Sequence, residues 1–261
     1  MKPVPNAQYY VEAKEKARAD IGIFNGVDLS GWKGRDDLWS VRDGVIVGES
    51  KKRLGQTELL WSSVLVKDFH LAADMKLAST NQAGGIQFRS KPGTSPSQAI
   101  GYQADMGHTK SHGNLWGRLY HQNGRGILDW NTHGAKVVKP GDWNRYEILA
   151  VGHRIWTAVN GTLCSAVDDP QGELSGKIAF QLHDGAPQTI EIRIAAFSPK
   201  PKVALAGLTE PQLVARLTQL GTPKIAQVGK AATVRAAWRM SLERSLKSMK
   251  PAPSGSTIGA P

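Results

Sequence analysis

The chain has 261 residues, a net charge of +11, 28 glycines, eight tryptophans and one cysteine, Cys164. One cysteine excludes an intrachain disulfide framework or a thiolate metal cluster, and no apolar run approaches the roughly 18 residues of a membrane span. Residues 200–261 carry most of the charge, with ten Lys and Arg against Glu210 and Glu243. The body is nearly neutral and has no basic face interleaved with aromatic residues, which excludes nucleic acid as its partner.

In chain order, residues 1–20 form a polar segment in which VEAKEKARAD favours a short helix. This segment has no hydrophobic signal core, so two locations stay open: cytoplasmic, or periplasmic or secreted after removal of a leader. Residues 21–199 consist of short alternating runs separated by Gly, Asn, Asp and Pro. Asp43-Gly44 and Asn160-Gly161 predict tight hairpin turns. We therefore predict an all-β domain over 21–199, an antiparallel sandwich or jelly roll.

Residues 200–261 differ in composition and predict a short helical, basic C-terminal extension. LTEPQLVARLTQLG favours an amphipathic helix that begins after Thr209 and ends before Gly221. AATVRAAWRMSLERSLKSM is a second helical candidate, and KPAPSGSTIGAP has the composition of a disordered terminus. Two interpretations of the extension stay open: a solvated or self-packing tail, and a segment that docks a partner, an anionic membrane or a cell-wall polymer.

Polar and aromatic side chains alternate with core residues on several predicted strands. Successive side chains of a strand point to opposite faces, so one face is apolar while the other gathers hydrogen-bonding groups. Such faces can line one concave groove. The residues on the polar face are Gln87, Arg89, Gln103, Asp105, Trp116, Arg118, Tyr120, Gln181 and His183.

This combination is typical of sugar recognition, because aromatic rings stack on pyranoses and fork-shaped amides and guanidinium groups hold vicinal hydroxyls. The alternative is an ordinary wet outer face of an antiparallel sheet. Arg89 could equally pair with Asp105 as a structural bridge, and His183 could be a rim histidine. His108, His112, His121 and His133 lack the spacing of a helical zinc site. A divalent cation near Asp105 is an open alternative that no repeated acidic pattern supports.

Nine motifs, taken in order and spacing, resemble the family first catalogued as DUF1080 and described as 3-keto-disaccharide hydrolases, or 3-keto-glycoside lyases and hydratases. The resemblance covers about residues 21–198. The motifs are FNGVDLSGW, LWSVRDGVIVG, DFHLAADMKL, GGIQFRS, GYQADMG, WGRLY, PGDWNRYEI, VNGT and GKIAFQLHDG with IEIRIAAF.

The resemblance implies a concanavalin A-like jelly roll. It also implies cleavage of glycosides whose glucose ring was first oxidised at C3 by a separate sugar dehydrogenase. A base removes the acidified C2 hydrogen, the aglycone leaves C1, and water adds to the double bond. Placed on this scheme, His183 and Asp105 are the candidate base and acid. Arg89 and Gln103 would polarise the ketone or hold hydroxyls, Trp116 and Tyr120 would stack on the sugar, and Gln181 would fix a hydroxyl.

Two departures from the family pattern bear on activity. Many members have an NSG turn where this chain has NQAGG, and many have Glu where this chain has Gln103, which cannot act as a base. The main competing interpretation is a non-catalytic carbohydrate-binding module of the same fold, which would not need His183 and Asp105 together. A laminarinase-type glycosidase is disfavoured, because no strand carries carboxylates at alternating positions.

Overall fold

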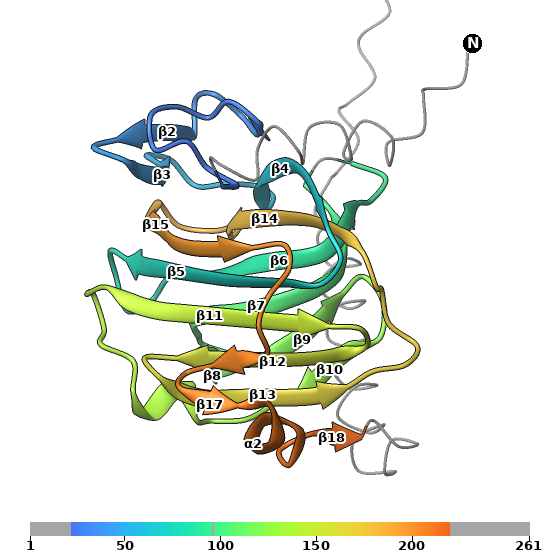
Figure 1. The fold of residues 1–261 in the computed structure, drawn as a ribbon. Helices are drawn as coiled ribbons and strands as arrows, with labels where there is room; N and C mark the ends of the chain where they lie inside the picture. The colour runs from blue at the N-terminus through green and yellow to red at the C-terminus, as the bar shows by residue number, and fades with distance from the viewer. Residues whose placement is uncertain (1–21, 96, 220–261) are drawn as a thin grey trace, which may run out of the picture. The chain divides into compact units, whose positions relative to one another are not determined.

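The computed structural model describes residues 22–95 and 97–219. In this part, two sheets of eight strands each form the layers of a β-sandwich, and nearly every neighbouring pair of strands is antiparallel. In Figure 1 the strands β5, β11, β12, β13 and β15 of one sheet lie in front of β6, β7 and β9 of the other. The prediction of an all-β, concanavalin A-like sandwich is therefore confirmed.

Sheet A has the spatial order β1-β4-β14-β6-β7-β9-β10, with β8 paired to the end of β7. Its strands are β1 (Trp32–Lys33), β4 (Glu58–Val66), β14 (Gly176–Leu182), β6 (Ala83–Pro92), β7 (Ala99–Thr109), β9 (Leu119–Gln122), β10 (Gly126–Asp129) and β8 (Gly113–Asn114).

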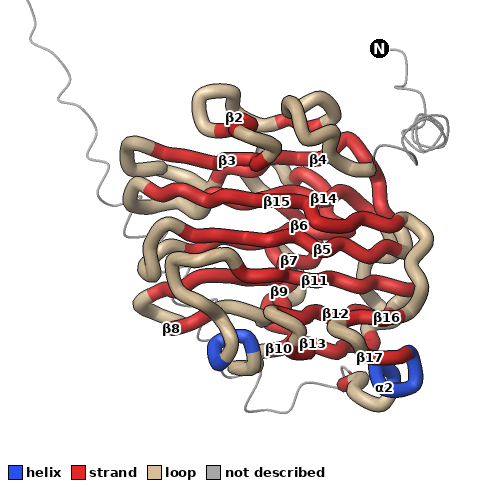
Figure 2. Tube along the Cα trace, turned by 60° about the vertical axis from the view of Figure 1, so that its left-hand side comes forward, coloured by secondary structure: helices blue, strands red, loops and turns tan. Residues whose placement is uncertain are grey.

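Sheet B has the order β18-β13-β12-β11-β5-β15-β3-β2, and its strands from β13 to β2 can be followed from bottom to top in Figure 2. Its strands are β18 (Thr218–Gln219), β13 (Thr162–Asp168), β12 (Arg154–Val159), β11 (Asn144–Val151), β5 (Phe69–Leu77), β15 (Gln188–Ser198), β3 (Val45–Ser50) and β2 (Trp39–Arg42).

The core lies between the two sheets and is built from the apolar face of each. Burial of this face is the main favourable term in folding, and it fixes which residues of each strand point outward. From sheet A the fully buried members include Leu60, Ile86, Phe88, Tyr102 and Phe180, and from sheet B Leu71, Met75, Tyr146, Ile148 and Ile192.

Both predicted hairpin turns are present. Asn160 and Gly161 connect β12 to β13 with φ values of 48° and 76°. Asp43 and Gly44 connect β2 to β3 with φ values of 50° and 73°. Two consecutive residues with positive φ give the turn whose twist matches that of the strands, which is why Asn-Gly and Asp-Gly occur here.

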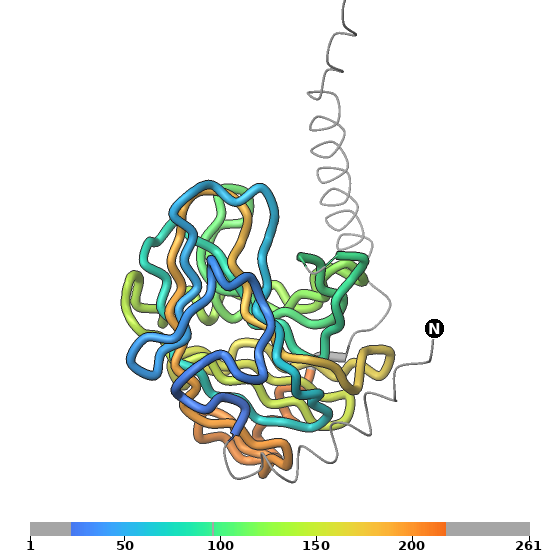
Figure 3. Tube along the Cα trace, turned by 90° about the horizontal axis from the view of Figure 1, so that it is seen from above, coloured from blue at the N-terminus to red at the C-terminus, as the bar shows by residue number. Residues whose placement is uncertain are grey.

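The described part of the C-terminal extension packs on the outer face of sheet B. A hairpin of β16 (Ala204–Leu205) and β17 (Leu208–Thr209) leads into α2 (Glu210–Val214), at the margin of the described chain in Figure 3. Thr209 precedes the helix as predicted, and its N–H donates to Gln212 Oε1 (2.8 Å). Trp156 Nε1 donates to the Leu213 carbonyl (3.0 Å).

This helix is shorter than the amphipathic pattern predicts, because the chain turns after Val214 to pair β18 with β13. The short 3₁₀ turn η1 (Gly134–Lys136) is the other helical element of the described residues. No helix in this part is long and apolar enough to cross a membrane. The predicted helix near the N-terminus, the second C-terminal helix and the terminal segment lie outside the described residues.

Candidate active site

The outward face of sheet A brings polar side chains from four strands into two rows. The first row runs Trp61, Ala179, Gln87, Gln103 and Tyr120 on β4, β14, β6, β7 and β9. Regular pairing between neighbouring strands puts these side chains next to one another on one face. The face predicted from sequence alternation therefore exists for Gln87, Gln103 and Tyr120.

The second row lies beside the first and contains Leu59, Gln181, Gly85 and Asp105 on β4, β14, β6 and β7. Gly85 lacks a side chain, so Gln103 of the first row extends over it. A Cβ at this position would lie 2.7–2.8 Å from Cγ, Cδ and Nε2 of Gln103. The glycine therefore gives Gln103 the space to reach Asp105 and Gln181.

Hydrogen bonds join these side chains into one network, which we call the amide cluster. Gln87 Nε2 donates to Gln103 Oε1 and to Gln122 Oε1. Gln103 Nε2 donates to Asp105 Oδ1 (2.5 Å) and to Gln181 Oε1 (3.2 Å). The members of the amide cluster are Gln87, Gln103, Asp105, Gln122 and Gln181.

The amide cluster is not the wet outer face of an ordinary sheet. Gln87 is fully buried, and Gln103 and Asp105 each expose 7%. Burying a polar group is costly unless it is hydrogen-bonded, and this network meets that requirement for each amide. For these three residues the solvated-surface interpretation is therefore wrong.

Asp105 is the ionisable member of the cluster. Burial raises its pKa to about 7, while the hydrogen bond from Gln103 and the positive charge of Arg118 act in the opposite direction. Desolvation favours the neutral acid, and the donors favour the carboxylate. Asp105 can therefore exchange a proton near neutral pH, as a general base requires.

Arg118 stands beside Asp105 and links the cluster to an aromatic ring that the sequence analysis missed. Its Nη1 donates to the His112 carbonyl (3.0 Å), and its Nε donates to the Asn131 carbonyl (3.2 Å). The guanidinium carbon lies 3.9 Å from the ring centre of Trp130, which is 36% exposed. Burial lowers the pKa of Arg118 and the Asp105 charge opposes this. The arrangement places a cation and a partly exposed indole next to the acid.

Trp116 does not lie on the polar face. It is 5% exposed, belongs to the core between the sheets and stacks on Tyr146 with ring centres 6.1 Å apart. The predicted return strand is interrupted by a turn at Gly117, whose φ is 83°. This turn breaks the alternation, sending Trp116 inward while Arg118 reaches the Asp105 side.

Arg89 also lies away from the amide cluster, and it does not bridge to Asp105. Its side chain is completely buried, with Nε donating to the Lys67 carbonyl (2.8 Å) and Nη1 to the Gly152 carbonyl (2.6 Å). Its φ is 47°, at an irregularity in the pairing of β6 with β7. A bulge re-aims the side chain, so counting by twos from Gln87 fails at this residue.

His183 follows the last residue of β14, two positions beyond Gln181. Its side chain is 41% exposed, and its Nδ1 contacts the backbone oxygen of Asp184 (2.8 Å). Among the described residues, no hydrogen bond joins His183 to Asp105. Its position two residues beyond Gln181 leaves a role at this face as a prediction.

The structure shows no cluster of three or more His, Cys, Asp or Glu side chains within 22–95 and 97–219 that could hold a metal ion. His112 contacts Trp130 edge-on, and His121 pairs with Glu173 at 2.7 Å. A divalent cation near Asp105 stays the open alternative that it was in the sequence.

Replacing Gly85 by alanine tests the packing of the amide cluster. The added methyl group would push Gln103 away from Asp105 and Gln181, so we expect KM for the substrate to rise about tenfold or more. The matched control is Gly55→Ala, because a Cβ there has no atom within 4 Å. Steady-state kinetics that show equal KM values for the two variants would contradict this role of Gly85.

Comparison with known protein families gives one match that covers most of the chain. A family model described as a 3-keto-alpha-glucoside-1,2-lyase-like domain matches residues 20–195. The match contains both rows of the outward face of sheet A. No curated protein matches the chain.

Solved structures with a similar chain trace have low sequence identity. A "putative glycosyl hydrolase" from Parabacteroides distasonis is 20% identical with a TM-score of 0.47, covering 70% of this chain and 97% of that one. The carbohydrate binding module CBM66 from Bacillus subtilis is 14% identical with a TM-score of 0.43, covering 64% and 95%. The beta-glucanase of Bacillus licheniformis is 13% identical with a TM-score of 0.45, covering 66% and 94%. These similarities carry no functional assignment.

Proposed function

Because the chain belongs to the family of 3-keto-alpha-glucoside-1,2-lyase-like domains, we propose that it cleaves glycosides whose glucose ring carries a ketone at C3. The observation that carries this proposal is Asp105, a buried carboxyl group with a pKa of about 7 that is held by a network of amides. A 3-keto sugar has an acidic hydrogen on C2, and a base that titrates near neutrality is the group its removal needs.

In the proposed reaction, the Asp105 carboxylate takes the C2 hydrogen and the electron pair forms the C1–C2 double bond. The bond from C1 to the aglycone oxygen breaks, and that oxygen receives a proton. Water then adds its hydroxyl to C1 and a proton to C2, which gives 3-keto-glucose. The net change is hydrolysis, and no oxidant or reductant is consumed.

The neighbours of Asp105 have roles that follow from their chemistry. The charge of Arg118 stabilises the enolate oxygen that develops at C3. It takes the role that the sequence pattern gave to Arg89, because the Arg118 charge acts on Asp105 while the Arg89 side chain is completely buried away from the amide cluster. The amides of Gln103 and Gln181 exchange their mutual hydrogen bonds for those of sugar hydroxyls, and Trp130 or Tyr120 offers a ring for stacking.

The substrate is an oxidised oligosaccharide or glycoside, so a sugar C3-dehydrogenase must act before this protein. The alternative is a non-catalytic carbohydrate-binding module. One feature favours it: Gln103 stands where many family members have Glu. A binding module would use the same face without proton transfer at Asp105.

The test is to incubate the full chain with a 3-keto-glucoside and, separately, with the unoxidised parent glucoside. The proposal predicts aglycone release from the oxidised sugar alone. Saturable binding of either sugar without cleavage would show that the protein is a carbohydrate-binding module and does not catalyse this reaction. Repeating the assay with EDTA tests the alternative of a divalent cation near Asp105, because a bound metal would make cleavage sensitive to the chelator.

His183→Ala tests whether the imidazole protonates the leaving oxygen. An acidic phenol leaves without help, whereas an alkoxide needs a proton. We expect cleavage of an alkyl 3-keto-glucoside to fall by about 10²-fold, and cleavage of a nitrophenyl 3-keto-glucoside to change less than about threefold.

The matched control is His153→Ala, which removes another half-exposed histidine, one that pairs with Asp168. It should leave both rates unchanged. Equal losses on the two substrates in His183→Ala would contradict the assignment of His183 as the acid.

A further inference from the structure

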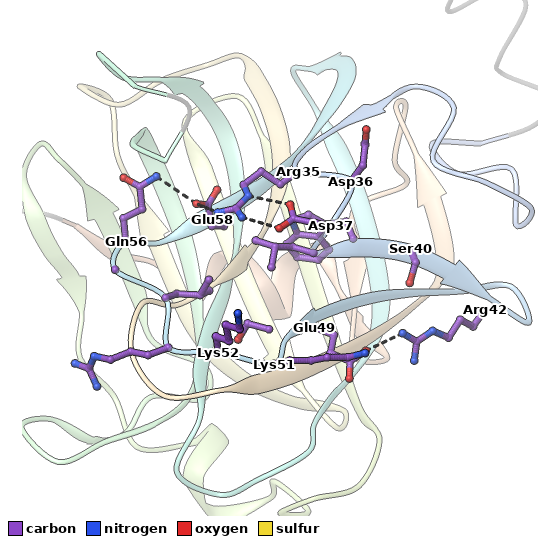
Figure 4. A pocket seen from close by; sticks show the side chains of 16 residues that line it. Arg35, Asp36, Asp37, Ser40, Arg42, Glu49, Lys51, Lys52, Gln56 and Glu58 are labelled. Carbon is purple, nitrogen blue, oxygen red and sulfur yellow. Dashed lines mark hydrogen bonds and ion pairs between the residues drawn. The ribbon is translucent and has the colours of Figure 1, made fainter.

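A second polar site lies at the margin of the sandwich, away from the amide cluster. A cavity of about 650 Å³ opens between the β2–β3 hairpin and the segment 51–58 (Figure 4). Its lining contains no member of the amide cluster. This volume lies within the range of pockets that bind small ligands.

Some charges of the cavity are paired with one another. Arg35 contacts Asp37 at 2.7 Å and Glu58 at 3.1 Å, as the dashed lines in Figure 4 show. Arg42 contacts Glu49 at 2.8 Å. These ion pairs join two arginines to three carboxylates, so the paired groups carry a net charge of −1.

Three consecutive cations, Lys51, Lys52 and Arg53, line the same cavity. They are exposed, and none of them forms an ion pair with any residue in the part of the chain that the structure describes. Asp36 is the one lining carboxylate without an ion pair to a described residue. The three unpaired cations outnumber Asp36, and the lining as a whole keeps five cations against four carboxylates, so the excess of positive charge lies at residues 51–53 and attracts an anionic group there.

One residue that lines the cavity has a buried donor without an acceptor. Trp39 lines it and is 3% exposed, and among the described residues its Nε1 has no hydrogen-bond partner. Glycines on both sides hold the indole in place. A Cβ on Gly34 would lie 2.9 Å from its Cδ1, and one on Gly48 would lie 2.5 Å from its Cζ3. A buried N–H without a hydrogen-bond partner costs free energy, so an oxygen acceptor at this donor would stabilise the protein.

We propose that this cavity binds a sugar that carries an oxyanion, either a carboxylate or a phosphate. Lys51, Lys52 and Arg53 hold the oxyanion, and the indole N–H of Trp39 donates to an oxygen of the ligand. The site goes beyond the proposed cleavage of 3-keto-glycosides, because the two sites share no residue. It gives the protein a preference for charged saccharides that the amide cluster does not supply.

The experiment uses the full chain, titrated with glucuronate, glucose 6-phosphate, inorganic phosphate and glucose. The first readout is the indole N–H NMR signal of Trp39, assigned from its loss in Trp39→Phe, and the second is calorimetric affinity. We expect one or both charged sugars to shift this signal saturably. The two sugars distinguish a carboxylate from a phosphate as the recognised group.

Two variants make the proposal falsifiable. Lys51→Ala/Lys52→Ala/Arg53→Ala should weaken binding at least tenfold, and Trp39→Phe should weaken it severalfold while the protein stays folded. The control Lys110→Ala/Lys136→Ala/Lys200→Ala removes the same charge from exposed positions outside the cavity, and it should leave the affinity within twofold.

Three results would overturn the proposal: equal binding of glucose, no loss of affinity in the triple variant, or inorganic phosphate that binds as tightly as the charged sugars. Cleavage of 3-keto-glycosides, the proposed activity, is measured separately. The triple variant should cleave a neutral 3-keto-glucoside at the wild-type rate whether or not charged sugars bind.

Discussion

Asp105→Asn is expected to lower kcat for a 3-keto-glucoside by about 10²–10⁴-fold, the range in which general bases contribute. Asparagine has nearly the same shape, and its side-chain oxygen can still accept the hydrogen bond from Gln103 that the carboxylate accepts now. The variant therefore removes the base and keeps the network. The measurement is single-turnover aglycone release by wild type and variant at the same pH.

The pH dependence gives a second signature of the same group. The native pKa of Asp105 is about 7, above its ordinary value of about 3.9, so the native state binds more protons than the unfolded state between these limits. Wild type should therefore lose stability relative to Asp105→Asn as pH rises from about 4 to about 7, by a few kcal/mol. Its kcat/KM should rise over the upper part of this range and level off above pH 7.

Denaturant unfolding of both proteins at pH 5 and pH 8 checks the sign. A variant that is inactive but at least as stable as wild type at pH 8 supports Asp105 as the base. A variant that cleaves at the wild-type rate would show that the amide cluster is structural or serves binding alone.

Arg89→Ala should destabilise the protein by about 3–5 kcal/mol, the cost of breaking a buried charged network and leaving a cavity. The side chain is fully buried, and its removal leaves the carbonyls of Lys67 and Gly152 without their donor. Because Arg89 is not part of the amide cluster, KM of the folded fraction should stay within about twofold. Urea unfolding and steady-state kinetics measure the two effects.

The matched control is Arg42→Ala, which removes an exposed arginine paired with Glu49. It should cost less than about 1 kcal/mol, as exposed ion pairs do. If Arg89→Ala proved as stable as this control and raised KM, the structural role of Arg89 would be contradicted and its predicted place in the substrate site restored.

Sequence alternation predicted the candidate site wherever the strands are regular. Gln103 and Asp105 lie two residues apart on β7. Gln87 lies on β6, which pairs with β7, and Gln181 lies on β14, which pairs with β6. The core residues next to these amides in the sequence, such as Phe88 and Phe180, are apolar. Their burial fixes the register, and the register fixes the face on which each amide lies.

The prediction failed at two positions where the backbone leaves the extended conformation. Arg89 has a φ of 47° at an irregular pairing, and Gly117 has a φ of 83° in a turn that sends Trp116 into the core. Gly117 gave a signal that a turn could occur, since glycine adopts positive φ without strain. Arg89 gave no such signal in the sequence, because only its hydrogen bonds to the distant carbonyls of Lys67 and Gly152 hold it in this conformation.

Other residues of the site were missed for different reasons. Gln122 is two positions beyond Tyr120 on β9, so extending the same alternation by one step would have predicted it. Trp61 sits on β4, where Leu59 and Leu60 are both buried, so an apolar run on both faces hides its direction. Trp130 follows β10 in a loop and meets Arg118 only in the folded chain.

Cleavage of a 3-keto-glucoside in D2O tests the central claim most directly. Removal of the C2 hydrogen and later addition of water place one solvent deuterium on C2 of the released 3-keto-glucose. We expect one deuterium at C2 at the earliest times by mass spectrometry and NMR, above the exchange of 3-keto-glucose incubated alone. Product released with its original C2 hydrogen would contradict proton abstraction by Asp105 and identify direct hydrolysis.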